Sequence, residues 1–108
     1  MARYFVLWRE NPRAQFPTDP SEALKLQEKI YAGIDALIKK GLIEEIGVFP
    51  DGTTGYAIAK GEATDVFSGV NMFQRYLVYE VCQEIIPYEK SKEVTRKLLK
   101  DLIAVAKK

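Results

Sequence analysis

Few side chains in this 108-residue sequence are suited to catalysis, and histidine is not among them. Without histidine the chain lacks the commonest general base near neutral pH and the commonest transition-metal ligand. The single cysteine, Cys82, cannot form a disulfide within the chain. We therefore expect no metal site and no cofactor. This cysteine usage, with no targeting signal before the first strand, favours a reducing, cytoplasmic environment.

Two glutamates are the candidate catalytic groups. Glu80 and Glu84 stand four residues apart in one expected strand, which separates them by about 13 Å at about 3.3 Å per residue. That separation is too long for a pair of carboxylates that share a proton. Burial beside aromatic rings would raise the pKa of either carboxyl and make it a useful acid or base near neutral pH. The alternative is that both are solvated or paired with lysine.

Aromatic side chains and the cysteine are the candidate ligand-binding groups. Tyr4, Trp8 and Tyr56 could stack on a planar molecule or donate hydrogen bonds, and equally they could fill a dimer interface. Cys82 lies in mid-strand, where a thiol is usually a small core hydrophobe. The loop over residues 10–18 and its approach carry groups that could bind an anion or simply be solvated: Arg9, Asn11, Arg13 and Gln15.

Periodicity, turn residues and helix caps predict the elements that position these groups. Segments rich in β-branched and aromatic residues predict strands at residues 2–9, 42–49, 54–60 and 77–86. A long amphipathic helix follows its expected cap, Asp19, and ends before Gly41. A shorter helix opens at residues 61–65 and ends near Met72. Ser91 is expected to cap a last helix that runs to about Ala106.

The resulting order, βαββαβ with a central hairpin, predicts one ferredoxin-like α+β domain over residues 1–108. We expect a four-stranded antiparallel sheet with two helices on one face. Alternation assigns to the helix side Phe5, Leu7, Ala57, Ala59, Tyr79, Val81 and Ile85. It assigns to the other face Tyr4, Val6, Trp8, Tyr56, Ile58, Glu80, Cys82, Glu84 and Ile86. Either alternation of the second strand buries Glu44 or Glu45.

The face away from the two helices is too apolar to lie comfortably in water. Either the last helix covers it within one chain, or two copies pack sheet against sheet. Both can also occur together, with the last helix packed against the partner subunit.

Charge is nearly balanced, with 16 basic and 15 acidic residues. This balance gives no general attraction to nucleic acid or to an anionic membrane, and no apolar run approaches the about 20 residues that span a bilayer. We therefore expect neither as a partner. The distribution is uneven, because residues 89–108 hold seven basic and three acidic residues. This segment carries +4 and the rest of the chain −3.

The long fourth strand followed by a proline and a last helix (VYEVCQEIIPYEKSKEV), after a hairpin and a short helix, resembles the dimeric α/β-barrel superfamily. That superfamily includes muconolactone isomerases and cofactor-free monooxygenases. The resemblance spans nearly the whole chain in element order but has no diagnostic motif. It implies a homodimer whose two sheets form one barrel, with a small-molecule cleft in each subunit. Several branches place a histidine in that cleft, so no catalytic residue carries over to this chain.

We therefore expect a homodimeric α/β-barrel protein that binds a small apolar or aromatic molecule, with Tyr4, Trp8, Tyr56 and Cys82 as its ligand-binding residues. One alternative is an isomerase or cofactor-independent monooxygenase of the same superfamily, in which Glu80 or Glu84 moves the proton. Another is a regulatory or structural interaction module that uses the last helix. The sequence names no substrate, reaction or pathway.

Overall fold

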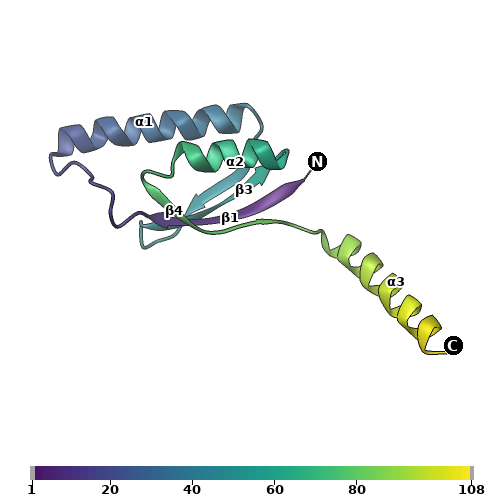
Figure 1. Ribbon diagram of the computed structural model, residues 1–108. Coiled ribbons are helices and arrows are strands. Elements are labelled where there is room, and N and C mark those ends of the chain that lie inside the picture. The colour runs from purple at the N-terminus through teal and green to yellow at the C-terminus, as the bar shows by residue number, and fades with distance from the viewer. Residues whose placement is uncertain (1, 108) are drawn as a thin grey trace.

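The computed structural model describes residues 2–107, which form a four-stranded antiparallel sheet and three helices (Figure 1). The strands are β1 (Arg3–Glu10), β2 (Ile43–Val48), β3 (Thr54–Lys60) and β4 (Leu77–Glu84). The helices are α1 (Pro20–Lys39), α2 (Ala63–Met72) and α3 (Tyr88–Ala106). The strand order is β2-β3-β1-β4, with every neighbouring pair antiparallel. This α+β arrangement is compatible with the expected ferredoxin-like fold.

Local signals account for the ends of α1. The Asp19 carboxylate accepts a hydrogen bond from the Glu22 amide (3.1 Å), and Pro20 occupies the first turn, where its missing N–H costs nothing. Gly41 follows the helix with a φ of 80°, a backbone conformation that favours glycine. Both predicted boundaries of this helix are therefore confirmed.

The predicted start of the last helix is wrong. The helix begins at Tyr88, directly after Pro87, and Ser91 lies one turn inside it. The Ser91 amide donates to the Pro87 carbonyl (3.0 Å), and its hydroxyl donates to the Tyr88 carbonyl (2.8 Å). Ser91 therefore bonds back into a turn that is already helical instead of capping it.

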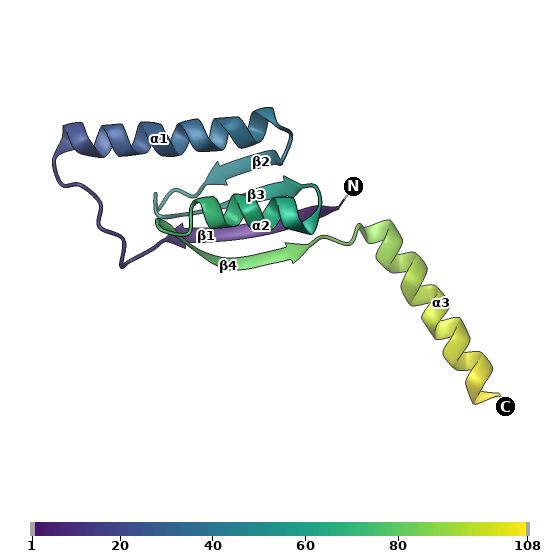
Figure 2. The same ribbon diagram turned by 45° about the horizontal axis from the view of Figure 1, so that its top comes forward.

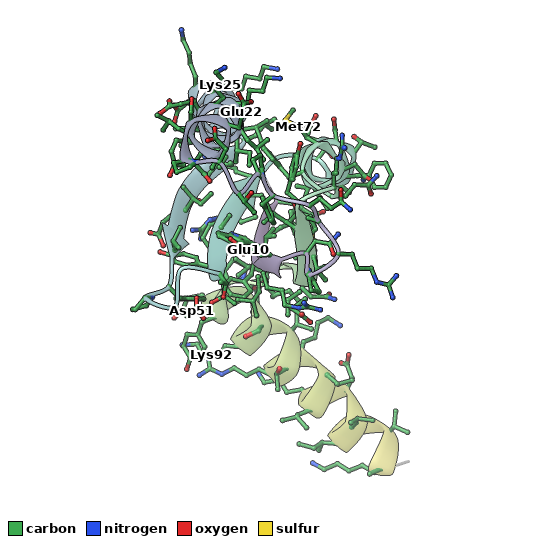
Figure 3. The ribbon with its side chains drawn as sticks, turned by 90° about the vertical axis from the view of Figure 1, so that its left-hand side faces the viewer. Glu10, Glu22, Lys25, Asp51, Met72 and Lys92 are labelled. Atoms are coloured by element: carbon green, nitrogen blue, oxygen red, sulfur yellow. The ribbon has the colours of Figure 1, made fainter. Side chains whose placement is uncertain are left out.

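Helices α1 and α2 lie on the same face of the sheet, α1 toward the β2 edge and α2 toward the β4 edge (Figures 2 and 3). Gly33 of α1 lets the two helices approach, because a Cβ there would lie 3.2 Å from the ring of Phe73, at the end of α2. The buried hydrophobic residues among those described are Val6, Leu37, Ala57, Val66 and Phe73. The core therefore lies between these helices and the inner strands.

The side chains of strand β1 point to the opposite faces of the sheet from those predicted. Val6 pairs with Ala57 on β3 and is buried beneath the helices, as is its partner. Paired residues share a face, so the helix side of β1 presents Tyr4, Val6 and Trp8, and Phe5 and Leu7 point the other way. Alternation failed here because both faces of β1 are apolar and aromatic, which leaves no polar positions to mark the solvent side.

Two bulges explain the other differences from the predicted sheet faces, which concern β2 and β4. The pairing of β2 with β3 shifts between Ile43 and Glu45, so the extra residue, Glu44, is free to pair with Arg3 (2.8 Å). Glu44 and Glu45 are both exposed, and the predicted burial of one of them does not occur. The pairing of β1 with β4 also shifts, which leaves Glu80 as the extra residue. A bulge reverses the face of everything beyond it.

Helix α3 leaves the end of β4 and projects away from the sheet on the side opposite α1 and α2 (Figures 1 and 3). The molecule measures 72 × 28 × 23 Å, and its radius of gyration is 19.3 Å. A compact chain of this length would have a radius of gyration of about 13 Å. Helix α3 therefore does not cover the sheet within its own chain. The sheet face away from α1 and α2, called the uncovered face below, is left without a helix.

Candidate functional site

A cavity of about 300 Å³ lies between the two packed helices and the sheet. Apolar side chains supply most of its wall. The sheet contributes Val6, Trp8, Ile43, Ile46, Ala57 and Tyr79, and the helices contribute Ile30, Ile34, Leu37, Val66 and Val70. Phe16, Phe73 and Tyr76 line it from the connecting segments. Its size and apolar lining are those of a small-molecule pocket.

Trp8 is part of the cavity wall, and a glycine on the neighbouring strand leaves room for its ring. It pairs across the sheet with Gly55, and a Cβ on Gly55 would overlap the indole ring. The indole ring therefore occupies the space that a side chain at position 55 would fill. None of the side-chain hydrogen bonds found in residues 2–107 involves the indole N–H.

Tyr79 supplies a second polar group to the same wall. It pairs with Trp8 from the neighbouring strand β4 and lines the cavity. Burial raises the pKa of its hydroxyl to about 12, with a smaller contribution from Cys82. The hydroxyl therefore stays protonated at ordinary pH and keeps its capacity to donate a hydrogen bond.

Tyr56 is separated from the other predicted ligand-binding aromatics. It pairs with Leu7, points to the uncovered face, and lies over Gly47, where a Cβ would come within 2.6 Å of the ring. Its hydroxyl donates to the Glu45 carboxylate (2.7 Å), and that bond is the main reason why its pKa is raised. The structure therefore brings Tyr4 and Trp8 to one face and Tyr56 to the other.

Cys82 and Glu84 lie on the helix side of β4, near its open edge. They pair with Val6 and Tyr4, respectively. Cys82 is exposed, so the expected core position is wrong. Although the thiol is accessible, the protein atoms around it partly desolvate it and raise its pKa, which disfavours the reactive thiolate. Desolvation and the neighbouring Glu84 carboxylate also raise the pKa of Tyr4.

The two candidate catalytic glutamates do not lie together at the cavity. Glu80 forms an ion pair with Arg9, whose backbone register places it on the uncovered face. Glu84 is exposed on the helix side. The cavity wall includes neither of them, and its acidic residues are Glu10 and Asp65.

Sequence reasoning missed the cavity because its wall is assembled from every element except α3. A usable signal was present in β3, where Gly55, Ala57 and Ala59 alternate with the larger Tyr56 and Ile58. Small residues on one face of a strand leave room above the sheet for bulky neighbours or for a ligand.

No family model, curated protein or solved structure matches this chain. Among residues 2–107 there is no cluster of three or more potential metal ligands from histidine, cysteine, aspartate and glutamate. In the same part of the chain, no helix combines the length and apolar character that crossing a membrane requires.

Proposed function

We propose that this chain is a homodimeric α/β-barrel protein that binds a small apolar or aromatic molecule in the cavity beneath α1 and α2. The observation that carries the proposal is the cavity itself, with an apolar wall that includes Trp8 and Tyr79. Aromatic rings stack on planar ligands, and a few convergent polar groups orient them.

The uncovered face supports the homodimer. At its centre lie Phe5, Leu7, Tyr56, Ile58 and Val81, placed there by their cross-strand pairing. Ion pairs flank this centre at both ends of β1, Arg3 with Glu44 and Arg9 with Glu80. A second copy that presents the same face would bury this apolar surface, and two facing sheets would form the barrel.

Helix α3 supports a second copy as the partner. Its apolar residues are more than half exposed: Val94, Leu98, Leu99, Leu102, Ile103 and Val105. The helix departs on the side of the uncovered face, where the facing subunit would lie (Figure 3). Residues 89–108 carry +4 and the rest of the chain −3, so α3 is complementary in charge to the body of another copy.

An interaction module for a different protein is the second candidate, and the exposed apolar side of α3 is the observation that favours it. A homodimer leaves little of this surface free, whereas an interaction module leaves α3 available in the isolated protein.

Native mass spectrometry on freshly purified protein tests the proposal. We expect a dimer with additional mass that is lost on collisional activation. Ala57→Leu places a larger side chain in the cavity wall and should abolish the additional mass but not the dimer. Ala32→Leu, on the exposed side of α1, is the matched control and should change neither. A bare wild-type monomer contradicts the homodimer, and a ligand unaffected by Ala57→Leu contradicts the cavity as its site.

A further inference from the structure

A second, more polar hollow adjoins one end of the cavity. Its basic side chains come from three segments: Arg13 from the loop before α1, Lys25 and Lys29 from α1, and Arg75 from the turn before β4. Glu22 is its one acidic residue. Figure 3 looks onto this end of the molecule and shows Glu22 and Lys25 on α1, above the end of the sheet that carries Glu10.

Most of the positive charge in this hollow is unneutralised by the protein. Lys25 pairs with Glu22 (3.3 Å). Arg13, Lys29 and Arg75 form no ion pair within the described residues. Cations that gather without a counter-charge repel one another, and an anion placed among them relieves that repulsion.

The cavity and the hollow share a wall. Tyr76 lines both, and its ring lies 6.0 Å from the ring of Phe16, which lines the cavity. The guanidinium of Arg75 lies 5.9 Å from the centre of the Tyr76 ring, on the side of the hollow. A molecule that extends along the Tyr76 ring therefore reaches both spaces.

The charges inside the cavity have the opposite sign. Its charged wall residues are Glu10 and Asp65, and neither lysine nor arginine contributes to the wall. An anionic group is therefore disfavoured within the cavity and favoured in the hollow, which gives a bound amphipathic molecule one orientation.

Asn11 holds the two arginine-bearing segments together. Its side-chain oxygen accepts from the Arg13 amide (2.9 Å), and its side-chain amide donates to the Arg75 carbonyl (3.5 Å). Its backbone amide donates to the Tyr76 carbonyl (2.8 Å). All three bonds reach backbone atoms of these partners, so both arginine side chains remain free for a ligand.

We infer that the ligand is an amphipathic oxyanion, with an apolar or aromatic body in the cavity and a carboxylate or phosphate in the basic hollow. This inference rests on the proposed function, because it requires the cavity to bind a small molecule. It adds the charge of the ligand and its direction of entry.

Isothermal titration calorimetry with 4-(2-naphthyl)butanoate and its neutral amide tests this inference on the full chain. We expect the carboxylate to bind about tenfold more tightly or better, because hydrogen bonds to a charged group are stronger than those to a neutral one. Arg13→Gln with Arg75→Gln should remove that advantage and leave the affinity for the amide unchanged. The matched control, Arg96→Gln with Lys97→Gln on α3, removes the same charge elsewhere and should change neither affinity. Amide binding by the first variant also shows that it is folded.

The outcomes separate this inference from the proposed function. Equal affinities for the carboxylate and the amide would overturn the inference and leave the cavity as a binding site. An advantage of the carboxylate that survives in the Arg13/Arg75 variant would place the anion elsewhere and overturn it as well. No binding of either compound would contradict both proposals. Titration of 2-(2-naphthyl)ethyl phosphate in parallel shows whether the site prefers a phosphate or a carboxylate. Either preference supports the inference if it is lost in the Arg13/Arg75 variant.

Discussion

Tyr79 links the cavity to the pH dependence of folding. Burial raises the pKa of its hydroxyl to about 12, whereas the ordinary pKa of a tyrosine is 10.0. The folded chain therefore holds this proton more tightly than the unfolded chain does between these pH values. The contribution of Tyr79 to stability is complete below pH 10 and is lost as pH rises toward 12.

We expect Tyr79→Phe to make the free energy of unfolding fall less steeply between pH 10 and 12 than in the wild type. The difference in the fall should be roughly 1–2 kcal/mol, after allowance for partial exposure of the side chain. Urea titrations at fixed pH, followed by circular dichroism, measure it. Tyr88→Phe, on an exposed position of α3, is the control and should keep the wild-type slope. A wild-type slope in Tyr79→Phe would show that the hydroxyl is not buried in solution.

The structure places the predicted ligand-binding residues on both faces of the sheet. Trp8 lines the cavity, although alternation assigned it to the face away from the helices. Tyr56 was assigned correctly to that face and is therefore remote from the cavity. The difference lies in β1, where five successive apolar or aromatic residues give no alternation to interpret. Pairing with the small residues Gly55, Ala57 and Ala59 of β3 decided which side chains of β1 face the helices.

At the scale of elements, the turn between β2 and β3 depends on one carboxylate. Asp51 accepts hydrogen bonds from the amides of Thr53 (2.9 Å) and Thr54 (3.0 Å) and from the Thr54 hydroxyl (2.7 Å). These bonds lower the pKa of Asp51 below its ordinary value of 3.8. Because the folded pKa is the lower one, this stabilisation is present above about pH 4 and is lost as pH falls through the folded value.

We expect Asp51→Ala to lower the Tm by a few degrees at pH 7 and by less at pH 2, because protonation of the wild-type carboxyl as pH falls weakens these hydrogen bonds. Thermal unfolding followed by circular dichroism at the two pH values measures the effect. Asp35→Ala, an exposed position on α1, serves as the control and should leave the Tm unchanged at pH 7. An equal loss at both pH values would indicate that the turn does not depend on the ionised carboxylate.

Local chemistry accounts for most of the element boundaries. Caps, glycines and prolines placed α1, β3 and α2 close to their predicted positions. Neither of the two bulges was predicted, because each depends on the partner strand. Glu44 reaches Arg3 of β1, and Glu80 reaches Arg9, also of β1. Each bulge exposes a charged residue that pairs with a residue of another strand. The sequence of the bulged strand alone therefore does not reveal it.

At the scale of the whole molecule, the uncovered face and α3 are both expected to hold the second copy. Leu7→Asp changes the centre of that face, and Leu98→Asp with Leu102→Asp changes the apolar side of α3. Each variant should weaken the dimer. For the α3 pair we expect a loss of affinity of about 100-fold or more, since each buried leucine contributes about 1.5–3 kcal/mol. Light scattering after size-exclusion chromatography over a range of concentrations measures the shift.

Two controls make this result specific. Lys97→Gln with Lys100→Gln changes the net charge of α3 as much as the leucine pair does, on its polar side, and should leave the dimer intact. Leu24→Asp, on an exposed position of α1, controls for the charge added to the sheet. An unaffected dimer in the α3 variant would leave α3 free for a different protein. An unaffected dimer in the Leu7 variant would contradict the barrel.

The sequence by itself determined the number, order and type of the elements, because hydrophobic periodicity, caps and turn residues act within a few residues of one another. It also indicated that the face of the sheet away from the two helices would be apolar. Only the tertiary structure decided which side chains lie on which face, since pairing and bulges join residues that are far apart in the chain. The tertiary structure likewise decided that α3 projects from its own sheet, and that Arg13 and Arg75 meet beside a cavity lined by Trp8 and Tyr79. These arrangements arise from contacts between elements, and a linear pattern does not encode them.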